Sequence, residues 1–108
     1  MTTFEEREKA FEKKFAHDQE LKFKAEARRN RMLGEWAGAL LGMSGAEVED
    51  YIKAVRKADL AQKGDEDVFR KIRADFDAKN VSISDEDLRA KMSEFLAQAV
   101  EQLEASKQ

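Results

Sequence analysis

The chain has 108 residues and a net charge of −3, with 40% charged and 42% apolar residues, no proline and no cysteine. This is the size of one small domain with a modest core. The lack of proline favours long helices. The lack of cysteine excludes disulfides and thiolate metal sites, and the single histidine, His17, cannot form a metal site alone.

The charge pattern and the N-terminus predict a soluble, cytoplasmic protein without direct membrane insertion. No apolar run approaches the roughly 18 residues of a membrane span. Glu5, Glu6 and Glu8 stand where a signal peptide needs basic residues. Residues 21–33 carry a local net charge of +4, whereas residues 34–108 carry −5. The overall acidity argues against nonspecific nucleic-acid binding.

The first predicted helix runs from Thr2 to Leu41. Phe4, Phe11 and Phe15 fall at spacings of seven and four, so they share one face. A helix of this length, about 40 residues, is about 60 Å long. The apolar stripe continues with Leu21, Ala25, Met32, Trp36 and Leu40.

Local signals mark the ends of this helix. Two overlapping capping boxes, Thr2-x-x-Glu5 and Thr3-x-x-Glu6, predict its start, and Gly42 is suited to the left-handed stop. Gly34 and Gly38 lie inside the helix, on the face away from Trp36. They predict either the close approach of another backbone or a point where the helix bends or frays.

Three further helices follow, each with a start signal, a stop signal and an apolar face. The first begins at the capping box Ser44-Gly-Ala-Glu47 and ends near Gly64. Asp65 is predicted to cap the second, which ends at Lys79-Asn80, and Ser84 to cap the third. The apolar faces comprise Val48, Tyr51, Ile52, Val55 and Ala58; Val68, Phe69, Ile72 and Phe76; and Leu88, Met92, Phe95, Leu96, Ala99 and Leu103.

These elements predict an all-α fold, a four-helix bundle with a long first helix. The three shorter helices are long enough to cover the first helix only from about Leu21 to Leu41, where Met32, Trp36 and Leu40 are the expected anchors. We therefore expect two parts: residues 1–20, which project or are unfolded when free, and a bundle over residues 21–108.

Catalytic chemistry finds no support in the sequence. The stretch Gly38 to Ser44 contains glycines and a serine but no lysine before the serine, so it is not a phosphate-binding loop. His17 lies in the projecting segment, where an exposed surface position is the simpler interpretation. Carboxylates gather at helix starts, where they cap or are solvated. The sequence thus predicts a protein that is not an enzyme.

The most concentrated basic feature is Arg28-Arg29-Asn30-Arg31. On a helix these side chains point in several directions. Two interpretations stand side by side: pairing with acidic residues of the bundle, or contact with an acidic partner surface. Nucleic acid is disfavoured because no aromatic base-stacking platform accompanies them.

The phenylalanine stripe of residues 1–20 has the pattern of a helix that binds in a groove. Arg7 and Lys14 border the three rings on one side, and Glu5, Glu8 and Glu12 lie towards the other. A coiled-coil homodimer is an alternative, although Glu8 and Asp18 stand where apolar residues should recur. Binding to a membrane surface is disfavoured by the acids near the N-terminus.

Three stretches resemble the alphaproteobacterial ATP synthase inhibitor family, the zeta subunits. They are T-F-E-E-R-E-K-A-F-E-K-K-F-A-H-D, F-K-A-E-A-R-R-N-R and L-G-E-W-A-G. The resemblance runs the full length, and the N-terminal 40 residues are its specific part. It implies a four-helix protein that inhibits ATP hydrolysis by the rotary F-type ATP synthase.

The resemblance further implies a mechanism. The mobile N-terminal segment becomes helical and enters a catalytic α/β interface against the γ stalk, where it blocks rotation in the hydrolysis direction only. The segment is then about Thr2 to Asp18, and the implied contacts are Thr3, Phe4, Arg7, Phe11, Lys14, Phe15 and Asp18. Lys22, Arg28, Arg29 and Arg31 are expected as secondary contacts.

The resemblance also implies a location and a free state. We expect a monomer when free, peripheral at the inner membrane through the synthase. Binding of ATP or ADP is implied by the resemblance only, since no nucleotide motif is present. Two other functions remain open: a homo-oligomer built through the phenylalanine stripe, and a small adenine-nucleotide-responsive sensor.

Overall fold

The computed structural model describes residues 19–61 and 65–106, which form four helices. These are α2 (Gln19–Leu40), α3 (Ala46–Ala61), α4 (Glu66–Ala78) and α5 (Asp85–Ala105). The described part of the chain contains no strand. The predicted all-α, four-helix fold is therefore confirmed.

Helix α2 corresponds to the second half of the long predicted helix. It ends at Leu40, one residue before the predicted end. The predicted start at Thr2 lies outside the described residues. The predicted division at residues 20 and 21 stays a prediction.

Two helices end in the left-handed turn that the sequence predicts. After α2, Gly42 has a φ of 83°, and the Met43 amide donates to the Gly38 carbonyl over 2.9 Å. After α4, Asn80 has a φ of 58°, and the Val81 amide donates to the Phe76 carbonyl over 2.8 Å. Both are Schellman motifs, which satisfy carbonyls that the helix end leaves free.

The start of α5 is also as predicted. The Asp87 amide donates to the Ser84 hydroxyl oxygen over 3.0 Å, so Ser84 is the N-cap. Asp85, Glu86 and Asp87 follow in the first turn, where the helix dipole favours negative charge. These local signals fix the direction in which α5 leaves the preceding loop.

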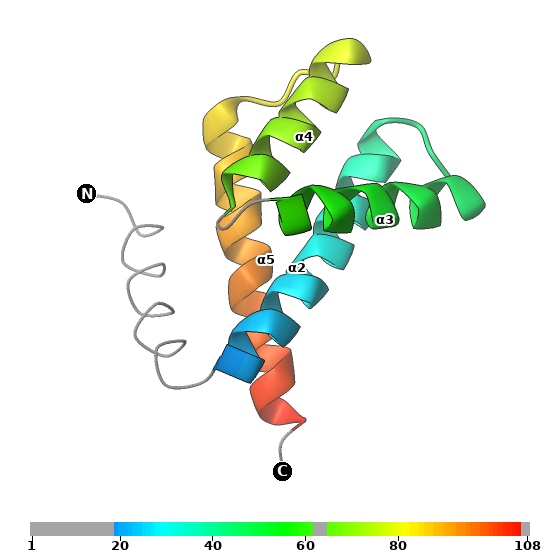
Figure 1. Cartoon of the computed structure of the whole chain (residues 1–108). Helices are drawn as coiled ribbons and strands as arrows, with labels where there is room; N and C mark the ends of the chain where they lie inside the picture. Colours follow the sequence, from blue (N-terminus) through cyan, green and yellow to red (C-terminus); the bar gives the residue numbers. More distant parts are fainter. Residues whose placement is uncertain (1–18, 62–64, 107–108) are drawn as a thin grey trace.

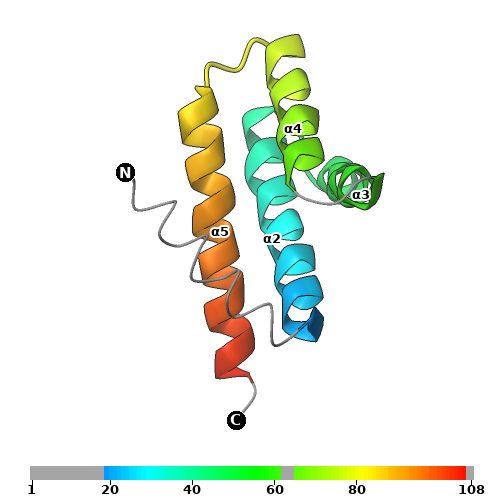
Figure 2. The same ribbon diagram turned by 60° about the vertical axis from the view of Figure 1, so that its left-hand side comes forward.

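Three of the helices run alongside one another, and the fourth crosses them. Helices α2 and α5 lie side by side in opposite directions, with α4 beside their upper ends (Figures 1 and 2). Helix α3 runs across α2 and α4, and it is seen nearly end-on in Figure 2. Helix α2 therefore packs against neighbours on two sides, α3 and α5.

The described core has two parts. The larger lies among all four helices and includes Leu33, Val55, Ile72, Phe76 and Leu88, each fully buried. The smaller joins the first turns of α2 to the last turns of α5 through Leu21, Ala25, Leu96, Ala99 and Val100. All four apolar residues predicted for α4, namely Val68, Phe69, Ile72 and Phe76, are buried.

The predicted anchors of α2 need correction. Leu40 is 42% exposed, and Met32 and Trp36 are only partly buried. The buried apolar side chains of α2 are Leu21, Ala25, Leu33 and Ala37. The prediction from a single apolar stripe is wrong here because α3 packs against a second side of α2. Leu33, Gly34 and Ala37 lie on that side.

Gly34 is where α2 and α3 come closest. A Cβ at this position would lie 2.6 Å from the Ile52 Cγ1 and 3.0 Å from the Ile52 Cα. At Gly38 the nearest atom would be the Val48 Cγ2 at 3.7 Å, an ordinary contact. The predicted close approach of another helix is therefore confirmed, and it is centred on Gly34.

Gly34→Ala should destabilise the bundle by about 1–3 kcal/mol, because the added methyl group meets the Ile52 backbone and α3 must shift. Gly38→Ala is the matched control. It should be neutral or stabilising by up to about 1 kcal/mol, since alanine is the better helix former and the site has room. Urea unfolding followed by circular dichroism measures both. Equal effects of the two substitutions would contradict the close approach.

Candidate functional site

The predicted inhibitory contacts lie outside the described residues. They are Thr3, Phe4, Arg7, Phe11, Lys14, Phe15 and Asp18. The secondary contacts, Lys22, Arg28, Arg29 and Arg31, all lie on α2 and can be placed.

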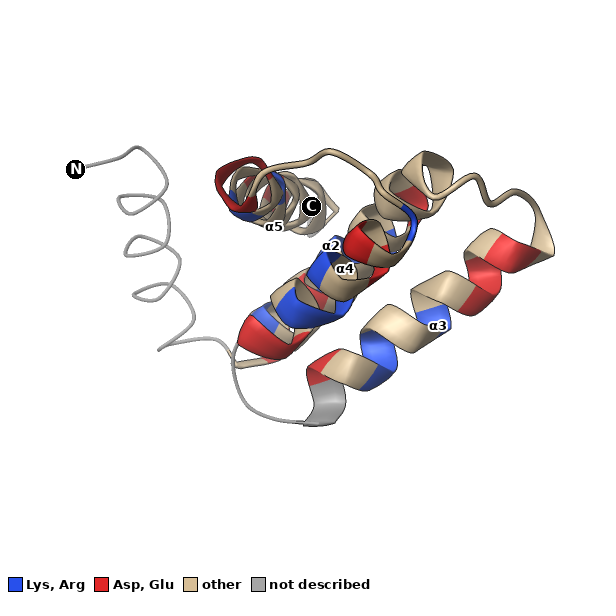
Figure 3. Cartoon of the chain, turned by 90° about the horizontal axis from the view of Figure 1, so that it is seen from above, with Lys and Arg blue, Asp and Glu red and all other residues tan. Residues whose placement is uncertain are grey.

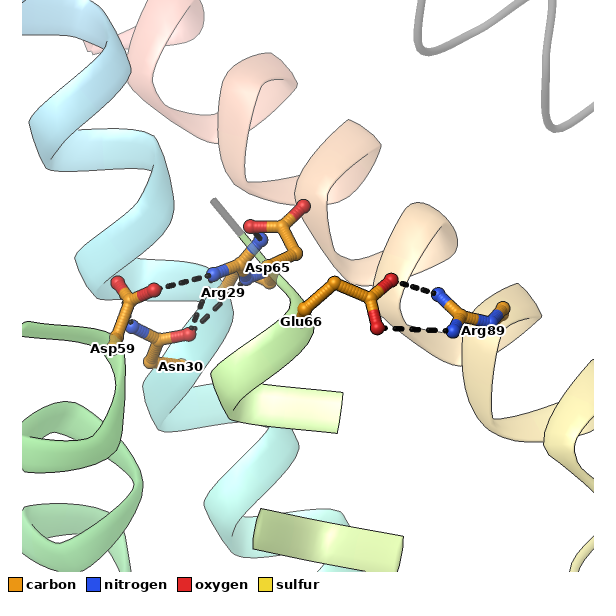
Figure 4. Close-up of polar contacts among 6 residues, drawn as sticks. All are labelled: Arg29, Asn30, Asp59, Asp65, Glu66 and Arg89. Carbon is orange, nitrogen blue, oxygen red and sulfur yellow. Dashed lines mark hydrogen bonds and ion pairs between the residues drawn. The ribbon is translucent and has the colours of Figure 1, made fainter. Parts of the chain in front are cut away.

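Arg29 is the largest fully buried side chain of the described structure, with 1% of its surface exposed. Its guanidinium donates to the Asp65 carboxylate over 2.6 Å and to the Asn30 Oδ1 over 2.9 and 3.1 Å. The Asp59 carboxylate lies 3.6 Å away and accepts a hydrogen bond from the Asn30 amide (Figure 4). We call Arg29, Asn30, Asp59 and Asp65 the Arg29 cluster.

The Arg29 cluster joins three helices. Arg29 and Asn30 belong to α2, Asp59 lies near the end of α3, and Asp65 immediately precedes α4. A buried charge is tolerated only when it is paired and hydrogen-bonded. The cluster therefore ties the end of α3 and the start of α4 to the middle of α2.

Asp65 binds Arg29 of this cluster and does not cap α4 as predicted. It occupies the N-cap position of α4, but its side chain accepts no capping hydrogen bond. Its carboxylate points to Arg29 instead (Figure 4). The position predicted from the sequence is right, and the predicted bond is wrong because the buried guanidinium takes the carboxylate.

The other predicted secondary contacts also have neighbours within the bundle. Arg28 donates to the Gln102 side chain of α5 over 3.2 Å, and Arg31 lies 3.0 Å from Glu49 of α3. Lys22 is half-buried. Of the two interpretations of the basic stretch, the structure supports pairing within the bundle for Arg29 and Arg31. Arg29 is not available as a surface contact.

Glu26 stands one turn before Arg29 and lies partly within the same environment. Burial raises the pKa of its carboxyl group above the ordinary value. Arg29 opposes this shift, while the negative charges of Asp59 and Asp65 add to it. Three carboxyl groups thus surround Arg29, and burial makes that of Glu26 harder to ionise.

A second polar group lies beside the first, between α4 and α5. Arg89 forms a two-pronged ion pair with Glu66 over 3.0 and 3.3 Å (Figure 4). The Arg89 guanidinium also stacks 3.9 Å from the centre of the Phe69 ring. The hydrogen bond from Arg89 lowers the pKa of Glu66. Both partners are about half exposed, so this pair closes the α4–α5 contact at the surface.

A third group joins α3 to α4. The Tyr51 hydroxyl donates to the Asp75 carboxylate over 2.8 Å, and Lys71 pairs with the same oxygen over 2.9 Å. Burial raises the pKa of the Tyr51 hydroxyl, and the hydrogen bond to Asp75 raises it further. These groups hold one another in fixed partnerships, which suits a structural role.

Neither a metal centre nor a membrane span appears in the part of the chain that the structure describes. No group of three or more potential ligands among histidine, cysteine, aspartate and glutamate comes together within residues 19–61 and 65–106. None of the described helices is long and apolar enough to cross a bilayer.

Comparison with known families decides what this bundle is. A family model described as ATPase inhibitor subunit zeta matches residues 1–102. The chain belongs to this family. The match spans the phenylalanine stripe as well as α2 to α5 as far as Gln102, so the zeta resemblance inferred from the three sequence stretches is confirmed.

A solved structure agrees with this assignment. A solution NMR structure of a protein 42% identical in sequence matches with a TM-score of 0.69, covering 80% of this zeta-family chain and 98% of the other. A comparison with curated proteins finds no match. The family therefore rests on the family model, and the solved structure supports the fold.

Sequence reasoning missed the partners of Arg29. Asn30 and Asp59 carry no motif, and the polar pair Arg29-Asn30 in the middle of an otherwise amphipathic helix was the only available signal. It could have been read as a buried polar pair facing a second helix.

Arg29→Met should destabilise the bundle by about 3 kcal/mol, because it leaves two carboxylates beside a core without their cation. The value lies at the lower end for a buried pair because water reaches Asp65, which is 46% exposed. Arg28→Met, one residue earlier on the exposed side, should change stability by less than about 0.5 kcal/mol. Urea denaturation at neutral pH measures both, and a stable Arg29→Met variant would contradict the account.

Proposed function

We propose that this zeta-family chain inhibits ATP hydrolysis by the rotary F-type ATP synthase. In this proposal the inhibitory element is the segment of residues 1–20, which enters a catalytic α/β interface and abuts the γ stalk. The observation that carries the proposal is the family match, which begins at residue 1 and so includes this segment.

The bundle supports this division of labour. The side chains of both described cores come from α2 to α5, and all of them remain when residues 1–18 are removed. The bundle offers paired, structural polar groups rather than a reactive constellation, which suits a regulatory protein that is not itself an enzyme. In the proposal, the N-terminal segment acts on another protein.

The phenylalanine stripe gives the segment its anchors. On the predicted helix Phe4, Phe11 and Phe15 share one face. Full burial of three phenylalanines contributes roughly 5–9 kcal/mol before costs. Ordering 15–20 residues costs on the order of 1 kcal/mol each, less whatever helix forms beforehand. The stripe alone therefore gives modest affinity, and contacts from charged side chains or from the bundle must add to it.

Placement against a rotating stalk makes the inhibition one-directional. Rotation in the hydrolysis direction presses the wedged helix into the closing interface, whereas rotation in the synthesis direction opens the interface and expels it. The protein would then be held at the inner membrane only through the synthase. Binding of ATP or ADP by the bundle stays a prediction.

Deleting residues 2–18 should abolish inhibition of the cognate ATPase, while circular dichroism still reports a folded bundle. Phe11→Ala should raise the half-inhibitory concentration roughly 10- to 100-fold, the equivalent of one buried ring. Lys13→Ala is the matched control, because Lys13 lies opposite the stripe on the same predicted helix. It should leave the half-inhibitory concentration within about twofold of the wild-type value.

Full inhibition by the truncated chain would overturn the assignment of the segment. Sedimentation at micromolar concentration separates the homo-oligomer alternative, since a stable dimer that Phe11→Ala dissolves would assign the stripe to self-association instead.

A further inference from the structure

We propose that the outer face of α3, formed by Lys53, Arg56 and Lys57, is a docking surface for an acidic protein surface on the ATPase that the chain inhibits. We call these three residues the α3 basic face. The inference rests on the proposed function and adds to it a second contact, made by the bundle rather than by the N-terminal segment.

The α3 basic face stands out because most other described cations are paired. Carboxylates lie within 4.0 Å of Lys24, Arg29, Arg31, Arg70, Lys71, Arg73, Arg89 and Lys91. Lys53, Arg56 and Lys57 are all exposed and have no carboxylate partner within the described residues. Lys22, Arg28 and Lys79 also have no carboxylate partner there, but they do not form one exposed group. Lys22 is half-buried on α2, Arg28 of α2 donates to the Gln102 side chain, and Lys79 lies just after α4.

Helix geometry places the three cations together. The core side of α3 includes Tyr51, Ile52 and Val55, which are buried. Lys53, Arg56 and Lys57 therefore point outward, and they lie within one and a half turns of one another. Figure 3 shows the basic bands in the second half of α3 and the acidic bands at its start. Three cations without a carboxylate partner among residues 19–61 and 65–106 thus form a positive patch on one exposed helical face, on a chain whose net charge is −3.

The structure thus changes where a basic contact with a partner is expected, from α2 to α3. The basic stretch of α2 was the more concentrated one in the sequence, but Arg29 is buried and Arg31 is paired with Glu49. On the neighbouring helix α3, three exposed cations have no carboxylate partner among the described residues, whereas on α2 only Arg28 is exposed and lacks one.

The surrounding charge selects the kind of partner. Glu47, Glu49 and Asp50 occupy the start of α3, and Asp59 follows the basic face. A phosphate polymer or an anionic bilayer would meet these acids over the same area and be repelled. A protein surface whose aspartates or glutamates form a small local group can face the three cations without covering the whole of α3. Such a patch mainly raises the association rate and fixes orientation.

A second contact of this kind would add binding free energy to the modest affinity that the phenylalanine stripe gives alone. Docking of the bundle holds the N-terminal segment near its site and makes its insertion effectively intramolecular. The test is the rate at which inhibition of ATP hydrolysis develops, measured with the full chain at several salt concentrations.

The triple variant Lys53→Glu/Arg56→Glu/Lys57→Glu should slow the onset of inhibition about tenfold at low salt. The wild-type rate should fall as salt rises and approach that of the variant, because screening removes the same attraction. The neutral variant Lys53→Ala/Arg56→Ala/Lys57→Ala should give a smaller slowing. It provides the test if charge reversal disturbs folding by circular dichroism.

Lys57→Glu and Lys79→Glu form the matched pair of controls. Both replace an exposed lysine without a carboxylate partner in the described structure and change the net charge equally. If Lys57→Glu slows the onset of inhibition and Lys79→Glu does not, the result supports docking through the α3 basic face. If both slow the onset equally, the effect is one of net charge, and the inference is overturned.

Three other outcomes also overturn the inference. Unchanged onset rates in the triple variant overturn it while leaving the proposed function intact. A wild-type dimer that sedimentation shows to be lost in the triple variant assigns the face to self-association. A wild-type chain that does not inhibit at all overturns the proposed function, and the docking surface falls with it.

Discussion

The described fold depends on one buried cation. Arg29 has 1% of its surface exposed, and such a charge is stable only where carboxylates and amides surround it. Asp59 and Asp65 provide the negative charge, and Asn30 links the guanidinium to Asp59. Because those two acids flank the connection between α3 and α4, the pairing sets where α3 ends and where α4 begins relative to α2.

The same constraint gives α2 two packed sides. Its contact with α5 is an ordinary apolar seam through Leu21 and Ala25, while its contact with α3 combines the Arg29 cluster with the close approach at Gly34. Arg28, Arg29 and Arg31 of α2 all have side-chain partners within the bundle. The cations of the α3 basic face have no carboxylate partner among the described residues.

Local chemistry made much of this predictable from sequence. The stops at Gly42 and Asn80 and the cap at Ser84 need only neighbouring residues, so their patterns predicted them correctly. The face of α2 was predicted less well, because a single apolar stripe describes a helix with one neighbour. Leu40 was therefore expected in the core, and the burial of Arg29 was missed, since its carboxylate partners lie 30 or more positions away in the sequence. The N-terminal contacts lie outside the described residues and stay predictions.

In the proposed mechanism the phenylalanine stripe, and not the bundle, occupies the catalytic interface of the synthase. A photo-crosslinking phenylalanine in place of Phe11 tests this most directly, with the same group in place of Lys79 on the bundle for comparison. In enzyme arrested during ATP hydrolysis, the account predicts that position 11 crosslinks to the α, β or γ subunits at the catalytic interface and that position 79 does not. Crosslinks from position 11 only to a second copy of the chain would contradict it.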